Sequence, residues 1–398
     1  MSQPGRTVES VRRANLAQLL SIVHQRGPQS RATLTEETGL NRSTIADLVA
    51  ELVRIGCVQE RSPDPSNRVG RPSPVVAVDP GVVAIAVNPE VDALEIAAVG
   101  LDQGIRAFVR IPRDDLLSPA ETARLVAEQL ETWRHTDLDG ARIVAVGLAV
   151  PGLVRAADGL VRNAPHLGWI DTPLRDLVST ATGLAVTVGN DASFGAIAEH
   201  LFGAAKDHDD VVYLNGGASG IGGGLIVHGM PVGGAGGYAG EFGQNRPGIA
   251  TLADRRAQGG VLEDEVSRAR LLAAVGLPRA DDRELAAALR AATAPDATAE
   301  IERERRILAT ALANAVNVLN PSVVVLGGFL AILASLDLPG LTHAVRAQSM
   351  PACAEDLDIR PAGLAEHRLL IGAAEAAFAE LLSDPTGVSA DRGAPSGH

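Results

Sequence analysis

The chain has 398 residues, enough for two or three domains, and 46% of them are hydrophobic, which provides for packed cores. Its formal net charge of −13 argues, as an average, against a nucleic-acid partner. The two cysteines, Cys57 and Cys353, support neither a disulfide framework nor a thiolate metal site. The N-terminus lacks the apolar core of a signal peptide and no apolar run reaches membrane-spanning length, so we expect a cytoplasmic protein without a membrane partner.

The first 75 residues depart from the average charge, because they hold ten arginines against seven carboxylates. Apolar residues spaced i, i+3, i+4, i+7 predict a first helix around Leu16–Val23 and a third around Ile45–Leu52. Between them, Ser30 is a suitable N-cap for a short helix over residues 31–38, which Gly39 ends. Two short helices joined by a tight glycine-containing turn are typical of a helix-turn-helix.

The third helix begins with four polar residues, at the end from which a recognition helix contacts bases. Arginine pairs with guanine and asparagine with adenine, while serine and threonine take base or phosphate. Two short strands, Val58–Glu60 and Val75–Val78, enclose a segment with further arginines, which suits a wing that reaches phosphates or the minor groove. The predicted DNA contacts are Arg31, Asn41, Arg42, Ser43, Thr44, Arg68 and Arg71. The alternative is a small helical bundle used for protein contact.

After residue 78, short apolar strands are followed by helices, which predicts an α/β fold of two similar lobes. The expected strands are 82–87, 93–99, 105–111, 143–150, 184–188, 211–214, 222–227 and 323–326. Ser118 and Glu121 predict a capping box after the third strand. The glycine-rich run 216–224 is either an anion-binding turn or a plain one.

Three acidic positions suggest hydroxyl chemistry. Asn190-Asp191, at a strand end and helix start, places a carboxylate where a bound hydroxyl could be held or deprotonated, although Asp is also an ordinary N-cap. Glu241 and Glu263 lie beside glycines and could accept further hydroxyl protons, or be solvated surface acids.

Together these features resemble the ROK family, the repressors and sugar kinases of the actin-like ATPase superfamily, over residues 8–382. Asn190-Asp191-Ala192 matches the segment whose Asp is the catalytic base in the family's kinases. Gly220–Gly224 matches its second phosphate loop, Gly240–Gly243 the start of its Gly-Glu-x-Gly-His motif, and Asn320–Gly328 its nucleotide-site strand and turn. The N-terminal pattern, including Gly70-Arg71-Pro72, is similar to the family's repressor branch.

The departures from the family pattern concern phosphate and zinc. Where the kinases carry Asp-x-Gly-x-Thr, this chain has residues 88–92, Asn-Pro-Glu-Val-Asp, so two carboxylates would face a polyphosphate and Pro89 removes a backbone donor. The positions of the family's zinc ligands are Gln244, Asp254, Arg256 and Val261. We therefore expect no zinc, no other cofactor and no catalytic residue.

The resemblance implies that Asn190, Asp191, Glu241, Gln244 and Glu263 contact a sugar. Gln244 replaces the motif's histidine with a side chain that still donates and accepts hydrogen bonds. The resulting hypothesis is a transcriptional regulator that senses a carbohydrate or sugar-phosphate without turnover and binds a palindromic operator as a homodimer or homotetramer. Its rivals are a sugar kinase with a DNA-binding head and a regulator without ligand.

The predicted organisation is a winged helix-turn-helix followed by a two-lobed actin-like ATPase (sugar-kinase-like) domain. The winged helix-turn-helix covers residues 1–78. The first lobe covers 79–189 and is completed by a C-terminal helix over 369–383, and the second lobe covers 190–368. We expect a disordered tail over 384–398.

Overall fold

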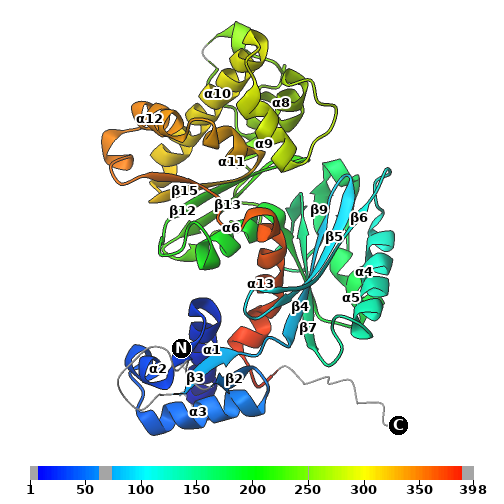
Figure 1. Cartoon of the computed structure of the whole chain (residues 1–398), viewed down its shortest axis with the longest axis vertical. Helices are drawn as coiled ribbons and strands as arrows, with labels where there is room; N and C mark the ends of the chain where they lie inside the picture. The colour runs from blue at the N-terminus through cyan, green and yellow to red at the C-terminus, as the bar shows by residue number, and fades with distance from the viewer. Residues whose placement is uncertain (1–7, 62–73, 250, 388–398) are drawn as a thin grey trace.

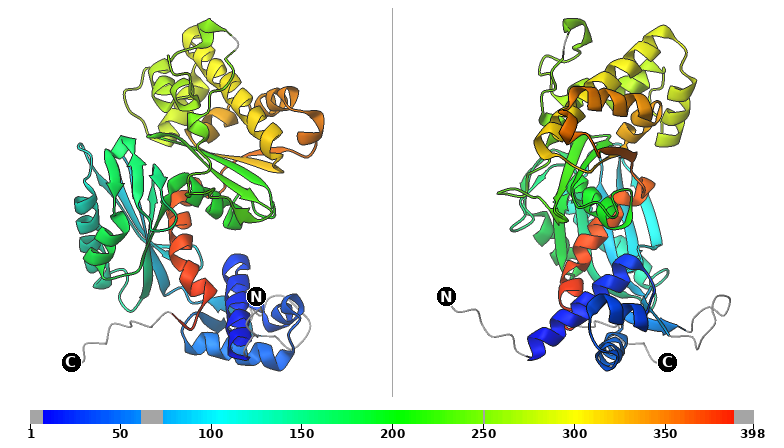
Figure 2. Two further views of the ribbon diagram at one scale, coloured as in Figure 1. Left: turned by 180° about the vertical axis from the view of Figure 1, so that it is seen from behind. Right: turned by 90° about the vertical axis from the view of Figure 1, so that its left-hand side faces the viewer.

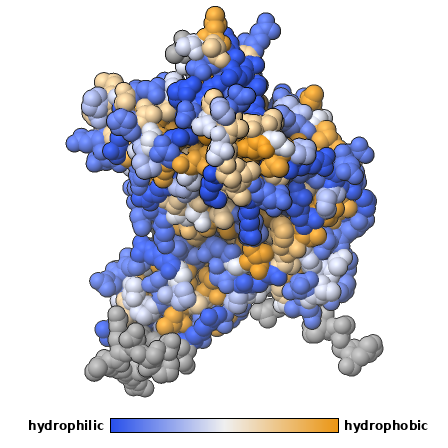
Figure 3. All heavy atoms as spheres, turned by 45° about the horizontal axis from the view of Figure 1, so that its top comes forward, coloured by the Kyte–Doolittle hydropathy of each residue, from blue (hydrophilic) through white to orange (hydrophobic). Residues whose placement is uncertain are grey.

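The computed structural model describes residues 8–61, 74–249 and 251–387. They form a small head and two lobes arranged one beyond the other (Figure 1). We call the part with the strands between residues 82 and 190 the N-lobe, and the part with the strands between residues 211 and 361 the C-lobe. Hydrophilic side chains predominate on the face seen in Figure 3, with hydrophobic ones scattered among them. No helix in these three ranges combines the length and apolar character needed to cross a membrane.

The head consists of three helices and a three-stranded sheet. Its helices are α1 (Val8–Arg26), α2 (Arg31–Thr38) and α3 (Arg42–Arg54), and its strands β1 (Gln29–Ser30), β2 (Val58–Arg61) and β3 (Val75–Val78) lie in the order β1-β3-β2. Ser30 caps α2 by accepting from the N–H of Thr33, and Gly39 ends it in the left-handed conformation. These helices begin and end where the periodicity and the caps predict, because local backbone chemistry sets them.

The N-lobe has a five-stranded sheet of order β11-β7-β4-β5-β6. Its strands are β4 (Val82–Pro89), β5 (Ala93–Gly100), β6 (Ile105–Pro112), β7 (Arg142–Val150) and β11 (Val186–Asn190). Helices α4 (Pro119–Arg134) and α5 (Leu174–Thr182) cover one face, and α13 (Arg368–Ser383) covers the other (Figure 1). A small sheet of β8 (Leu153–Val154), β9 (Val161–Ala164) and β10 (Trp169–Thr172) adjoins it.

The C-lobe has a second five-stranded sheet, of order β14-β13-β12-β15-β16. Its strands are β12 (Val211–Gly217), β13 (Gly220–Val227), β14 (Met230–Pro231), β15 (Val323–Gly328) and β16 (Asp358–Pro361). Tyr213 and Val325 face α6 (Asp191–Phe202), whereas Leu214 and Leu326 face the opposite helices, as the period of two requires. Those helices are α7 (Leu262–Glu265), α8 (Arg268–Ala274), α9 (Asp282–Ala291), α10 (Pro295–Leu319), α11 (Phe329–Ser335) and α12 (Leu338–Gln348).

Three local expectations need correction. The strand predicted from residue 184 starts at Val186 and runs on to Asn190. The capping box forms only in part, because Ser118 accepts from the N–H of Glu121 while the Glu121 carboxylate binds Arg113 instead. Residues 384–387, expected in a disordered tail, form a turn whose Asp384 lies 3.2 Å from the guanidinium of Arg13, and 388–398 lie outside the described residues.

Helix α13 joins the head to the lobes. In both views of Figure 2 it runs from between the lobes to α1. One hydrophobic core includes Leu20 and Val23 of α1 and Leu370, Phe378 and Leu381 of α13. The head is therefore packed onto the N-lobe as a continuation of its core, which burial of apolar surface stabilises.

A buried histidine forms the polar centre of this contact. His24, on α1, is 2% exposed; its Nδ1 lies 2.6 Å from the carbonyl oxygen of Leu101 and its Nε2 lies 2.8 Å from Oε2 of Glu375 on α13. Burial alone would lower the pKa of His24, but the bonds to Glu375 and Leu101 and the charges of Glu375 and Asp102 outweigh it and raise that pKa. Since both ring nitrogens face oxygen acceptors, we infer a doubly protonated ring.

The raised pKa gives a test of this contact. A histidine whose pKa is raised by folding contributes stability that is complete below the ordinary value of 6.5 and is lost as the pH rises through the raised one. Glu375→Gln removes the charged partner, so it should lower the free energy of unfolding by about 1–3 kcal/mol at pH 6, and by less at pH 8.5. Thermal or urea unfolding measures this difference.

Glu380→Gln is the matched control, since Glu380 is an exposed carboxylate on the same helix. A difference between wild type and Glu375→Gln that stays constant from pH 6 to 8.5 would contradict the ion pair.

Candidate functional site

A cavity of about 320 Å³ lies between the lobes. Its walls come from N-lobe residues 151–153 and 163–166, the start of α6, the β12–β13 hairpin, and the segments around residues 241–244 and 263. All five side chains that the resemblance assigned to a sugar line it: Asn190, Asp191, Glu241, Gln244 and Glu263. The cavity is also lined by Ser219, from the glycine-rich run, and by Asn163, His166 and Asn215, which belong to no motif recognised in the sequence.

The two residues at the start of α6 have different freedom. Oδ1 of Asn190 caps the helix by accepting from the N–H of Ser193 at 2.9 Å, and its Nδ2 donates to the Gly152 carbonyl at 3.1 Å. Asp191 is 8% exposed, and burial raises its pKa against the opposing pull of nearby backbone N–H groups and of Arg368. Asn190 therefore shapes the cavity, while the Asp191 carboxylate is the better placed to accept a bond from a ligand.

The opposite wall is rich in acceptors. Glu263 accepts from Nε2 of Gln244 at 2.5 Å with Oε1 and from the N–H of Ile221 at 3.3 Å with Oε2. Burial raises the pKa of Glu241, and the charges of Asp191 and Glu263 add to that rise. Three carboxylates around one cavity suit a ligand that brings hydroxyl donors and oppose an anionic one.

The glycine-rich run 216–224 is mostly strand, whereas the sequence analysis expected a turn before the strand predicted from residue 222. Its residues pair across β12 and β13, with Asn215 opposite Gly222 and Gly217 opposite Gly220, so that the connecting turn is only two residues long. A side chain on Gly222 would meet Ala192 of α6 at 2.8 Å, and one on Gly224 would meet the Ala192 carbonyl at 2.9 Å. These two glycines are therefore explained by close packing of β13 on α6.

The turn at residues 88–92 is arranged differently from the expectation that two carboxylates face a polyphosphate. Asp92 is exposed, and its Oδ2 accepts from Arg110 on β6 at 3.0 Å. Only Glu90 is left, and its Oε1 accepts from Nδ2 of Asn88 at 3.0 Å. Burial raises the pKa of Glu90 to about 7, partly offset by that bond and reinforced by the charge of Asp191.

An arginine that the sequence did not single out lies over the glycine turn of β15. Arg368, at the start of α13, donates to Oδ1 of Asn215 at 2.6 Å and to the hydroxyl of Tyr213 at 3.0 Å. A side chain on Gly327 or Gly328 would meet its guanidinium, at 2.9 and 3.2 Å. Arg368 therefore fills space beside the turn that the resemblance assigned to a nucleotide.

In the head, the predicted DNA contacts differ in availability. Arg42 is exposed at the start of α3 and, within the described part of the chain, makes no ion pair or hydrogen bond through its side chain. Arg31 instead donates to both carboxylate oxygens of Glu60, at 2.6 and 2.7 Å. Arg68 and Arg71 lie outside the described residues.

Asn41 caps α3, which engages the oxygen that a two-bond contact with adenine would need. Its Oδ1 accepts from the N–H of Thr44 at 2.9 Å and from Oγ of Ser43 at 2.7 Å. Nδ2 of Asn41 stays available, and the Ser43 hydroxyl can still accept a bond.

Comparison with known proteins identifies the family to which this chain belongs. The family model described as "ROK family" matches residues 89–380. The chain belongs to the ROK family. It is 25% identical over 387 residues to the xylose repressor of Caldicellulosiruptor bescii, covering 89% of this chain and 93% of the repressor. A glucokinase of Halalkalibacterium halodurans is 28% identical over 251 residues, covering 58% of this chain and 74% of the kinase.

The crystal structure of a ROK transcriptional regulator described as a homolog of the E. coli MLC protein superposes with a TM-score of 0.74 at 24% identity, covering 94% of this chain and 97% of that one. The α/β sugar-kinase-like fold is thereby established. Repressors and kinases both occur among the ROK relatives, so family membership alone does not decide between regulation and catalysis.

The side chains at the four zinc-ligand positions of the ROK motif do not form a zinc site in this chain. Of its four positions, Gln244 is bonded to Glu263, Val261 is apolar, and Arg256 lies 3.4 Å from Glu300. The Asp254 carboxylate accepts from Arg306 at 3.1 Å. The described residues contain no group of three histidine, cysteine or acidic side chains that could hold a metal ion, and a guanidinium among these positions would repel one. The residues present do not fit zinc.

The raised pKa of Glu90, in the turn at residues 88–92 of the N-lobe, can be tested by its effect on stability. Because folding raises its pKa from 4.5 to about 7, the associated stability is complete below pH 4.5 and is lost as the pH rises through 7. Glu90→Gln is neutral at every pH, so at pH 8 it should be more stable than wild type by about 1–3 kcal/mol, and the difference should vanish toward pH 4.5. Urea unfolding at both pH values measures it, with Asp92→Asn as control. A Glu90→Gln variant less stable than wild type at pH 8 would refute the buried acid.

Proposed function

We propose that this chain is a transcriptional repressor that binds operator DNA through residues 1–78, as a winged helix-turn-helix, and changes its operator affinity when a carbohydrate binds between the lobes. The observation that carries the proposal is the cavity itself. It gathers Asp191, Glu241 and Glu263 around one volume, while Arg368 lies beside the glycine turn, and Glu90 on the turn 88–92, that the resemblance assigns to nucleotide and phosphate. Hydroxyl recognition without phosphoryl transfer is the function this arrangement supports.

The cavity also supports a choice between ligand classes. Three carboxylates repel a phosphate, and each can accept a bond from a hydroxyl. An uncharged sugar therefore suits it better than a sugar-phosphate. One relative is named xylose repressor, and xylose is an uncharged sugar, which supports this choice.

The head supports DNA binding through α3. Arg42 is exposed at its first turn, and Asn41 and Ser43 flank it in the chain. We propose that Arg42 contacts a base directly and that Arg31 contacts a phosphate. The Arg31 guanidinium must then divide its donors between Glu60 and the DNA. If the protein is a dimer, its two-fold symmetry implies a palindromic operator.

Arg42→Ala should weaken operator binding by roughly 1–3 kcal/mol and relax base preference, if the arginine contacts a guanine through two bonds. Gel-shift titration at fixed salt, on duplexes selected by the wild-type protein from a random pool, measures both. Arg54→Ala is the matched control, because it removes the same charge from the other end of α3. Equal affinity of wild type and Arg42→Ala would exclude this helix end as the contact.

Calorimetry with a panel of neutral sugars tests the cavity. A sugar that binds the wild type should bind Asp191→Ala/Glu263→Ala at least roughly tenfold more weakly and should shift operator affinity by about 1.4 kcal/mol for each tenfold coupling. Asp139→Ala/Glu302→Ala removes two exposed carboxylates elsewhere and should behave as wild type. Sugar-dependent ADP release above background would favour the kinase instead. Absence of binding by every sugar would favour a regulator without ligand.

A further inference from the structure

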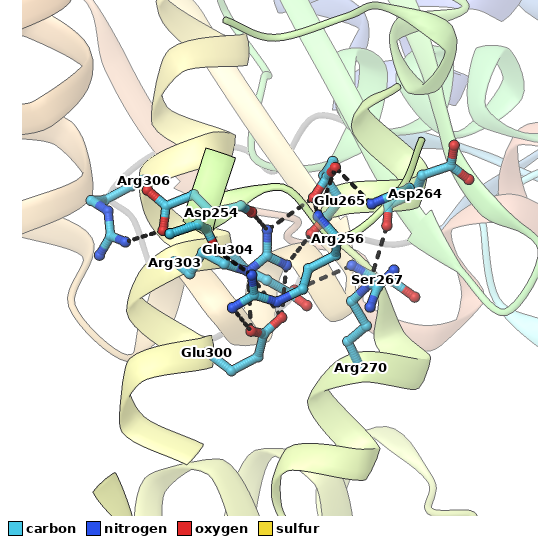
Figure 4. Close-up of polar contacts among 12 residues, drawn as sticks. Asp254, Arg256, Asp264, Glu265, Ser267, Arg270, Glu300, Arg303, Glu304 and Arg306 are labelled. Carbon is cyan, nitrogen blue, oxygen red and sulfur yellow. Dashed lines mark hydrogen bonds and ion pairs between the residues drawn. The ribbon is translucent and has the colours of Figure 1, made fainter. Parts of the chain in front are cut away.

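The segment from Asp254 to Ser267, where ROK proteins carry the zinc motif, is fastened to α10 by a buried arginine (Figure 4). Arg303 is 1% exposed. Its Nη1 donates to the Asp254 carbonyl at 2.9 Å and to Oε2 of Glu265 at 3.1 Å, and its Nη2 donates to the Glu265 carbonyl at 2.6 Å. Three bonds from one guanidinium thus reach two points eleven residues apart in the chain.

Glu265, the partner of Arg303, also binds other residues of the same segment. It is 0% exposed, and its carboxylate accepts from the backbone N–H of Arg256 at 2.9 Å and of Ala257 at 3.0 Å. The carboxylate therefore closes the segment on itself and binds Arg303 at the same time. A buried charge is tolerated only when it is paired and hydrogen-bonded, and both members of this pair meet that condition.

The residues around the Arg303–Glu265 pair, which together with it form what we call the network, balance its charges. Glu300 accepts from Arg303 at 2.7 Å and lies 3.4 Å from Arg256, as Figure 4 shows. Oε2 of Glu304 accepts from the N–H of Ser267 at 3.2 Å, and burial, reinforced by the charge of Glu300, raises the pKa of Glu304 to about 9, which favours its uncharged form. Two arginines thus face two buried or half-buried carboxylates.

The same short helix carries the network and a wall of the cavity. In α7, Glu265 points into the network, and Glu263, two residues earlier, lines the cavity and binds Gln244. The N–H of Leu262 donates to the Asn245 carbonyl at 2.8 Å, which ties α7 to the segment bearing Gln244. Displacement of Glu265 would therefore move both side chains of the wall.

We propose that the Arg303–Glu265 pair is a metal-free anchor that positions Glu263 and Gln244 for the effector, in the place where the family uses zinc. The proposal rests on the proposed function for the identity of the ligand. Arg303 is a positioning residue, since it does not line the cavity. A pair held by several bonds fixes α7 in place, because removing either partner leaves a buried charge uncompensated.

The first measurement is hydrogen exchange, which needs no ligand. Arg303→Met should speed exchange of the backbone N–H groups in residues 254–267 and leave the head unchanged. Arg305→Met is the control, because Arg305 lies on the same helix and pairs with Asp337 instead. Unchanged exchange in 254–267 would overturn the anchor.

Arg303→Lys serves if the methionine variant does not fold. It keeps the positive charge but cannot make the divergent bonds of a guanidinium. We expect faster exchange in 254–267 here as well, smaller in extent, and exchange equal to that of wild type would again overturn the proposal.

The second measurement is affinity for whichever neutral sugar binds the wild type. Arg303→Met, or Arg303→Lys in its place, should lose roughly tenfold, the scale of removing a supporting partner behind a ligand-binding side chain, whereas Arg305→Met should lose nothing. Operator affinity without sugar should be equal in all three. Equal sugar affinity in wild type and the Arg303 variant overturns the positioning role. If no sugar binds the wild type, the proposed function fails, and hydrogen exchange alone judges the anchor.

The third measurement separates this anchor from a metal site. Sugar affinity and exchange of the wild type should be the same in EDTA and in zinc chloride. A loss of either in EDTA that zinc restores would show that a metal holds the segment and would overturn the proposal.

Discussion

The close approach of α13 to its neighbours is the constraint on which the rest of the molecule depends. A side chain on Gly147 of β7 would collide with the Ala373 carbonyl, and one on Gly372 would collide with the Phe194 carbonyl of α6. Glycine at both contacts lets a single helix pack tightly against the N-lobe sheet and against α6, which bears on the C-lobe sheet. Arg368 at its start touches β12, and Glu375 in its middle touches the head through His24.

These contacts define the path by which a ligand bound in the cavity could affect the position of the head. Asp191 begins α6, α6 packs along α13, and α13 shares its core with α1. A ligand that prefers one arrangement of the lobes can shift the head only by its difference in affinity between arrangements. Because the head is docked by a buried core and an ion pair, a small rotation of α13 must be followed by the whole head or must break that contact. Either outcome changes how α3 lies relative to the two lobes.

Local chemistry explains why the head's helices and the long strands of the two lobe sheets could be predicted from the sequence, whereas the short strands β8–β10, β14 and β16 were not. Helix ends at Ser30, Gly39 and Asn41 depend on caps within four residues, and strands depend on alternation within one segment. Most of what the sequence did not reveal involves partners distant in the chain. No local pattern reveals that Glu60 holds Arg31, or that Gly222 accommodates α6. Five of the cavity residues were found through the family's motifs, whereas Arg303 and Arg368 belong to no motif and are recognised only once the fold brings their partners together.

The proposed loss of phosphoryl transfer, and a motif whose residues do not fit zinc, are physically compatible with the sugar-binding wall that we propose. In a kinase, a metal-bound nucleotide would offset the negative charge of the cleft. Here the Asp191, Glu241 and Glu263 carboxylates face one another, and burial raises the pKa of the first two. Hydroxyl donors relieve that repulsion by hydrogen-bonding to the carboxylates without adding charge, so the groups a kinase would use to orient its substrate become a source of affinity. What binding then requires is a wall that stays in place, and in this chain the rigidity comes from paired charges buried behind α7.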